Sequence, residues 1–100
     1  MSHSLTGAAM LHNEHDIVLQ NLRTLLADAA KLMRRGSADE RRRAAELLRP
    51  WAERCSDRKI GYCLHEIADA LHEGDAGSFW SAWNWVCGYY EGKTGKSLWV

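Results

Sequence analysis

The chain has 100 residues and a formal net charge of zero at neutral pH, because 13 lysines and arginines balance 13 aspartates and glutamates. This length predicts a single domain over residues 1–100. The neutral balance argues against strong nonspecific attraction to nucleic acid or anionic lipid. Apolar residues form 46% of the chain, which favours a packed globular domain over disorder.

Further features of the sequence predict a cytoplasmic protein. No apolar run approaches the ~20 residues that a membrane helix needs. The opening MSHSLTGAAML lacks the charged and apolar regions of a secretion signal. The three cysteines are irregularly spaced, which predicts free thiols in a reducing compartment rather than a disulfide framework.

The first predicted helix runs from about His12 to Arg35, and residues 1–11 are expected to be less regular. Its apolar positions recur at alternating steps of four and three residues, which is typical of an amphipathic helix. These positions are Val18, Leu22, Leu25, Ala29 and Leu32. Gly36 follows as the expected left-handed stop.

Ser37 is predicted to begin the second helix, because SADE has the form of a capping box between Ser37 and Glu40. We expect Pro50 to break or kink this helix, since proline lacks a backbone donor and disfavours helical geometry at Arg49. Arg42 and Glu46 are spaced for an ion pair along its surface.

The third predicted helix carries apolar residues from Ile60 to Leu71 at helical spacing, with Ser56 or Asp57 as its cap and Gly74 as its stop. The fourth begins at Asp75 or Ser78 and ends at Gly92. Residues 93–100 are expected to be less regular, with Leu98 and Trp99 docking on the body. Since short loops favour antiparallel neighbours, the sequence predicts an all-α fold. We expect a compact bundle of four amphipathic helices with short loops, or of five if Pro50 splits the second.

The fourth predicted helix contains FWSAWNWVCGYY, which holds six of the nine aromatic residues of the chain. At about 100° per residue, one stripe of this helix should face the core. It consists of Phe79, Trp83, Val86 and Tyr90. Apolar groups on both sides of that stripe cover more of the circumference than the roughly 100° that a packed surface helix needs. Either the helix is enclosed by its neighbours, or one flank binds another protein.

The flank farthest from the predicted core stripe carries Trp85 and Tyr89, which are neighbours at i, i+4. Tryptophan and tyrosine combine a large contact area with a polar tip and are enriched at binding hot spots. The sequence therefore predicts a non-enzymatic protein-binding module without a cofactor, acting as an adaptor, a regulatory subunit or an inhibitor. Self-association as a homodimer fits the same surface. Small size without recognisable chemistry is also typical of phage or mobile-element proteins that block a host complex, such as anti-CRISPR inhibitors. The predicted partner-binding residues are Trp80, Asn84, Trp85, Gly88, Tyr89 and Trp99.

A first alternative is a nucleic-acid-binding regulator that uses the arginine-rich region between the first two helices. Its candidate residues are Arg34, Arg35, Arg41, Arg42 and Arg43. Acidic residues are interleaved with these arginines, which instead favours a solvated, salt-bridged face.

A second alternative is a metal-binding bundle. Its candidate ligands are His12, His15, His65 and His72, two from each of two helices. The paired close spacings that mark structural zinc sites are absent from the sequence. For catalysis, Cys55 beside Arg54 and Arg58 is the thiol whose surroundings best suit a nucleophile, but the sequence supplies no partnering base.

Overall fold

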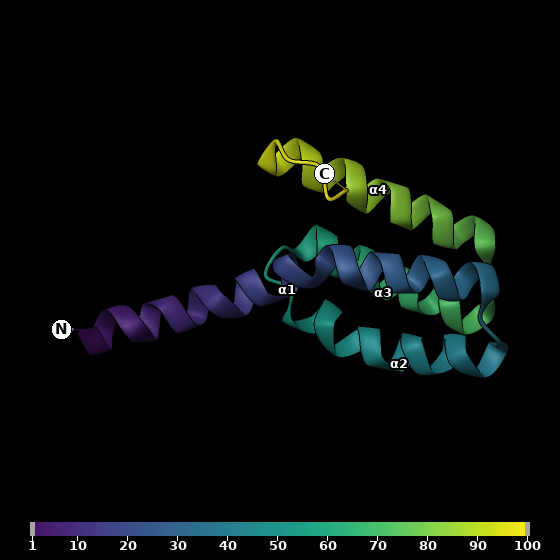
Figure 1. Ribbon diagram of the computed structural model, residues 1–100, viewed down its shortest axis with the longest axis horizontal. Helices are drawn as coiled ribbons and strands as arrows, with labels where there is room; N and C mark the ends of the chain where they lie inside the picture. The colour runs from purple at the N-terminus through teal and green to yellow at the C-terminus, as the bar shows by residue number, and fades with distance from the viewer. Residues whose placement is uncertain (1, 100) are drawn as a thin grey trace.

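The computed structural model describes the backbone of residues 2–99 and the side chains of residues 17, 18 and 20–99. Within residues 2–99 the chain forms four α-helices and no strand. These are α1 (Ser2–Arg35), α2 (Ala38–Arg54), α3 (Arg58–Glu73) and α4 (Ala76–Thr94). The connections are short, so each helix runs antiparallel to the next (Figure 1). The prediction of an all-α four-helix bundle is confirmed.

The helix α3 is the centre of the bundle. It packs most extensively against α2, then against α4, and it also contacts α1. Over the described residues α2 and α4 do not contact each other, because α1 and α3 lie between them (Figure 1). The helix α4 therefore forms one outer side of the molecule and has a surface that no other helix covers.

Helix α1 begins at Ser2, earlier than the predicted start near His12. The segment before His12 contains no proline and several good helix formers, so nothing in it stops the helix. The N-terminal part of α1 runs past the ends of the other three helices (Figure 1).

Of the break or kink predicted at Pro50, the break is wrong, since α2 continues through Pro50 to Arg54. A proline inside a helix costs about 3 kcal/mol because one hydrogen bond is lost. Packing beyond Pro50 offsets this cost, because Ala52 is buried and Trp51 packs on the core. Pro50 itself is exposed.

The predicted capping box at the start of α2 is confirmed. The Ser37 hydroxyl accepts a hydrogen bond from the Glu40 N–H at 3.1 Å, and the Glu40 carboxylate accepts one from the Ser37 N–H at 2.8 Å. The hydrogen bond from the Ser37 backbone N–H to its carboxylate also lowers the pKa of the Glu40 carboxyl. The cap at Asp57 and the left-handed stop at Gly74 (φ 72°) agree with the predicted bounds of α3.

Two predicted helix ends are wrong in detail. Helix α4 passes through Gly92 and stops at Gly95, whose φ of 71° is left-handed. Gly36 is not left-handed, and the chain passes directly into the extended N-cap residue Ser37. Gly36 is needed for space instead, since an added Cβ would lie 2.7 Å from the Leu32 carbonyl oxygen.

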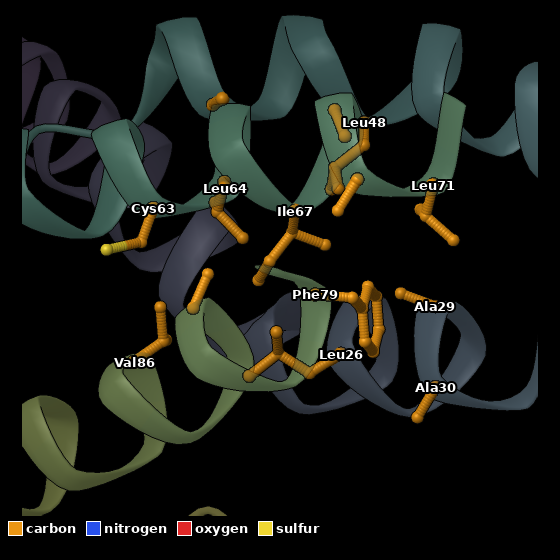
Figure 2. Packing of buried hydrophobic residues seen from close by; sticks show 14 of the residues in the cluster. Leu26, Ala29, Ala30, Leu48, Cys63, Leu64, Ile67, Leu71, Phe79 and Val86 are labelled. Atoms are coloured by element: carbon orange, nitrogen blue, oxygen red, sulfur yellow. The ribbon is translucent and has the colours of Figure 1, made fainter. Parts of the chain in front are cut away.

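The core lies where α3 faces α1, α2 and α4 (Figure 2). Its largest fully buried side chains come from α1, α3 and α4, and they leave less than 2% of their surface exposed. They are Val18, Leu22, Leu26, Leu64, Ile67, Leu71, Phe79 and Val86. Leu98 from the C-terminal tail is also buried, as the sequence predicts.

Candidate functional site

The aromatic helix α4 is packed on one side and open on the other. Of its predicted core stripe, Phe79 and Val86 are fully buried, whereas Trp83 and Tyr90 are half-buried. Ala82, which the helical wheel assigns to a flank, is buried as well. The centre of the buried face is therefore shifted slightly toward α3, and α4 is not enclosed by the bundle.

Trp85 and Tyr89 lie on the side of α4 that borders α3. Their rings stack with centroids 4.7 Å apart and planes 14° apart. Trp85 is the outer ring and keeps 44% of its surface exposed, whereas Tyr89 is half-buried. The pair is therefore a preformed aromatic surface whose outer member faces solvent.

Tyr89 is held in place by the N-terminal end of α3. Its hydroxyl donates to the Asp57 carboxylate at 3.0 Å, and the same carboxylate caps α3 by accepting the N–H groups of Lys59 and Ile60. The ammonium groups of Lys59 and Lys93 lie 5.8 and 5.5 Å from the centre of the Tyr89 ring. Tyr89 thus joins α3 to α4 and positions Trp85.

An open groove of about 480 Å³ separates Trp85 from α3. Its α3 wall carries Lys59, Tyr62 and Glu66, and we call it the α3–α4 groove. Tyr62 keeps 65% of its surface exposed. Tyr62 is not among the predicted partner-binding residues, although its spacing from the core predicts that it is exposed. Tyr62 lies two residues from the core residue Ile60, which places it about 200° round the helix on the polar face.

The other predicted partner-binding aromatics lie on the opposite flank of α4, beside α1. Trp99 from the tail stacks on Trp83 with centroids 5.2 Å apart. The Trp83 indole N–H donates to the Leu26 carbonyl of α1 at 3.0 Å. The guanidinium of Arg34 lies 5.1 Å from the Trp80 ring. This cluster attaches α1, α4 and the tail to one another, with Trp99 39% exposed at its edge.

Asn84 and Gly88 are exposed between these two flanks, and a Cβ added at Gly88 would meet nothing within 4 Å. The six predicted partner-binding residues therefore surround the open side of α4 and do not form one patch. Trp85 and Tyr89 belong to the α3 flank, and Trp80 and Trp99 belong to the α1 flank.

A second groove, of about 350 Å³, lies between α1 and α2 and was not foreseen from the sequence. Leu25 and Leu32 of α1 and Leu47 and Trp51 of α2 contribute to its apolar lining. Leu47 is 72% exposed there. Leu47 lies at the edge of the apolar stripe of α2. At such a position helical periodicity alone does not distinguish a buried residue from an exposed one.

The arginines of the nucleic-acid alternative are partly engaged within the chain. Arg34 lies over Trp80, and Arg42 pairs with Asp39 at 3.7 Å rather than with the predicted Glu46. Arg41 donates to the Gly36 carbonyl at 2.7 Å. Its Nε is buried and has no partner among the described atoms. Only Arg35 and Arg43 of this set are exposed and free of such contacts over the described residues.

The histidines of the metal alternative do not converge within the described side chains. His65 is half-buried, and His72 is exposed with its Nδ1 3.4 Å from the Glu73 carboxylate. Residues 17, 18 and 20–99 contain no group of three histidine, cysteine, aspartate or glutamate side chains that could hold a metal ion. The side chains of His12 and His15 lie outside the described residues.

The three thiols of Cys55, Cys63 and Cys87 are free. Burial raises the pKa of Cys55 and of Cys87. It raises the pKa of Cys63 to about 11, and the carboxylate of Glu66 contributes to that rise. A nucleophilic cysteine needs a lowered pKa, so the surroundings of Cys55 do not activate it.

Raising the pH is expected to destabilise the chain through Cys63. Below pH 9 the thiol is protonated in both the folded and the unfolded chain, so its contribution to stability is complete. As the pH rises from the ordinary thiol value of 9.0 toward the folded value of about 11, only the unfolded chain loses the proton. The melting temperature should therefore fall over this range. Calorimetry of Cys63→Ala should give a lower melting temperature, and this temperature should fall less steeply with rising pH than that of the unsubstituted chain. Equal dependence on pH in the two chains would contradict the prediction.

No helix in the described part of the chain is long and apolar enough to cross a membrane. No family model matches the chain, and neither curated proteins nor solved structures provide a match.

Proposed function

We propose that the chain is a non-enzymatic, cytoplasmic protein-binding module whose contact surface is the α3–α4 groove with Trp85 and Tyr62. One observation carries the proposal. Two large aromatic side chains from different helices, 44% and 65% exposed, border one groove on the outer side of a small bundle. A partner that covers both rings would remove a large apolar area from water, which favours binding. Tryptophan and tyrosine are also enriched among the residues that dominate binding free energy at interfaces.

The rigidity of the site supports the same function. Tyr89 is stacked under Trp85 and is fixed by its hydrogen bond to Asp57. The contact ring is therefore held before binding, which reduces the loss of side-chain freedom when a partner docks. Lysine and glutamate side chains also line the groove. Polar residues around an apolar centre are typical of protein–protein interfaces. Adaptor, regulatory-subunit and inhibitor roles all use such a surface.

Site-specific photocrosslinking in cells tests the proposal. A benzoyl-phenylalanine at Tyr62 replaces one exposed aromatic ring with another, and a second one at the exposed Glu53 of α2 is the control. We expect a discrete crosslinked protein from position 62 and none from position 53. Trp85→Ser in the same chain should abolish the crosslink by removing the facing ring, with helical circular dichroism retained.

The control variant Leu47→Ser removes an apolar side chain, 72% exposed, from the other groove. It should leave the crosslink from position 62 unchanged. If Leu47→Ser abolishes partner binding and Trp85→Ser does not, the binding surface is the α1–α2 groove and the proposal is wrong.

A further inference from the structure

The flank of α4 that borders α1 carries a pocket of its own, away from the α3–α4 groove. It has a volume of about 300 Å³ and is lined by Ala27, Ala30, Arg34, Trp83 and Trp99, and we call it the α1–tail pocket. The two alanines are small, so the two indole rings and the guanidinium supply its chemistry. The pocket therefore offers a flat aromatic wall next to a permanent positive charge.

The aromatic wall of this pocket is held in place by the fold. The Trp83 indole N–H donates to the Leu26 carbonyl oxygen at 3.0 Å, which fixes the ring against α1. Trp99 stacks on Trp83 with ring planes 16° apart and keeps 39% of its surface exposed. A further flat ring can extend this stack from the exposed side of Trp99, with little loss of side-chain freedom.

Positive side chains continue along α1 on both sides of the pocket. At about 100° per residue, Arg23, Ala27 and Arg34 lie within roughly 40° of one another, and Lys31 lies one turn from Ala27. The three cations are exposed, and none forms an ion pair with another described side chain. Arg34 lies over the Trp80 ring, which leaves its charge uncompensated. The row from Arg23 to Arg34 covers about 16 Å of helix.

Most of the acidic side chains that balance these charges lie elsewhere. Asp28, the acidic residue of α1 in this region, lines the α1–α2 groove. Within α4 the only acidic residue is Glu91, two turns beyond Trp83. Four other acidic residues line a depression on the far side of α4: Glu66, Asp69, Glu73 and Asp75. A formal net charge of zero for the whole chain therefore coexists with a positive flank along α1.

An aromatic platform beside a row of cations has the chemistry of a site for single-stranded nucleic acid, in which bases stack on rings and phosphates follow the cations. We infer that this flank binds a single strand, with one base stacked on Trp99 and neighbouring phosphates held by Arg34, Lys31 and Arg23. The cations extend along α1 past the pocket, which fits a strand of several nucleotides better than one free nucleotide. The inference goes beyond the proposed function, because the strand and a protein in the α3–α4 groove would occupy opposite flanks of α4.

Fluorescence anisotropy of a labelled oligothymidine tests the inference with the full chain. We expect binding at low salt that weakens as salt rises. Trp99→Leu should weaken it roughly tenfold or more, because the stacked base loses its platform. Trp85→Leu is the matched control, since it removes an indole of similar exposure from the other flank, and it should leave the affinity unchanged. Equal losses in the two variants would overturn the inference.

Removal of single charges gives a readout that does not depend on the Trp99 ring. Lys31→Gln and Arg23→Gln should each reduce the slope of log affinity against log salt by about 0.7, as expected when a single strand loses one phosphate contact. Arg43→Gln removes an exposed arginine of α2 and should leave the slope unchanged. If Trp99→Leu fails to fold by circular dichroism, these three variants decide the matter, and equal slopes in all three would overturn the inference.

Competitors identify the chemistry of the ligand. An unlabelled oligothymidine should displace the labelled strand. Polyglutamate, the matching duplex and thymidine monophosphate should each do so at least roughly tenfold less well, because none of them combines an exposed base face with a row of phosphates. Equal displacement by any of the three would overturn the inference, since charge alone or one nucleotide would then suffice. Failure of the oligothymidine to bind at low salt would overturn it as well.

Discussion

Replacing Phe79 with alanine is expected to lower the free energy of unfolding by about 4 kcal/mol. Phe79 is fully buried, and its ring points into the space between α3 and α1, toward Leu26 and Ala29 (Figure 2). It also packs edge-to-face on Trp80, with centroids 4.7 Å apart. Truncation loses the transfer free energy of the ring and leaves a cavity between helices that cannot fully close.

Chemical denaturation measures this loss, with Trp85→Ala as the control from the same helix. Trp85 is an aromatic residue of similar bulk, but nearly half of its surface is already in water. Its truncation should cost about 1 kcal/mol, mostly from the lost stacking on Tyr89. If Phe79→Ala proves too unstable to purify, Phe79→Leu should show a smaller loss of the same sign. Equal losses for Trp85→Ala and Phe79→Ala would mean that α4 is buried on both sides.

The contrast between Phe79 and Trp85 shows which part of the site can be predicted from the sequence. Helical periodicity alone assigns Phe79 and Val86 to the core, and both are fully buried. It also identifies Trp85 as the aromatic residue farthest from that stripe, and Trp85 is exposed. Periodicity describes directions within one helix, and these directions are set by about 100° per residue whatever the neighbours are.

Helical periodicity does not predict which of the other helices lies beside each flank of α4. Trp80 and Trp85 are both flanking residues, yet Trp80 meets Arg34 of α1 and Trp85 borders a groove against α3. The bond from Tyr89 to Asp57 joins residues 32 positions apart, so no local pattern contains it. The exposed Tyr62 becomes part of a site only because α4 is folded back beside it.

Pro50 illustrates the same limit for the fold. Local rules predict a break, and they are sound for an isolated helix. The segment after Pro50 stays helical because α3 packs on it, and a glycine lies at that contact. Gly61 is buried, and an added Cβ would lie 2.8 Å from the Ala52 carbonyl oxygen of α2. The close approach of α2 to α3 at this position therefore depends on a residue without a side chain.

The second large effect is expected at this contact, where Gly61→Ala should lower the free energy of unfolding by about 2 kcal/mol. In an open helix the same change stabilises by about 1 kcal/mol, because alanine has the higher helix propensity. Here the added methyl group would meet backbone, which cannot rotate away as the end of a side chain can. The helices α2 and α3 must separate slightly, and the packing around Ala52 and Ile60 is lost with that movement.

Gly88→Ala is the matched control, because Gly88 also lies inside a helix but an added Cβ there has nothing within 4 Å. One chemical change should therefore have opposite signs at two positions: destabilising at Gly61 and stabilising at Gly88. Denaturation at a concentration too low for self-association measures both free energies on the single chain. A stabilised Gly61→Ala would mean that α2 and α3 are not in backbone contact. In that case the packing that carries α2 past Pro50 would have to come from Trp51 instead.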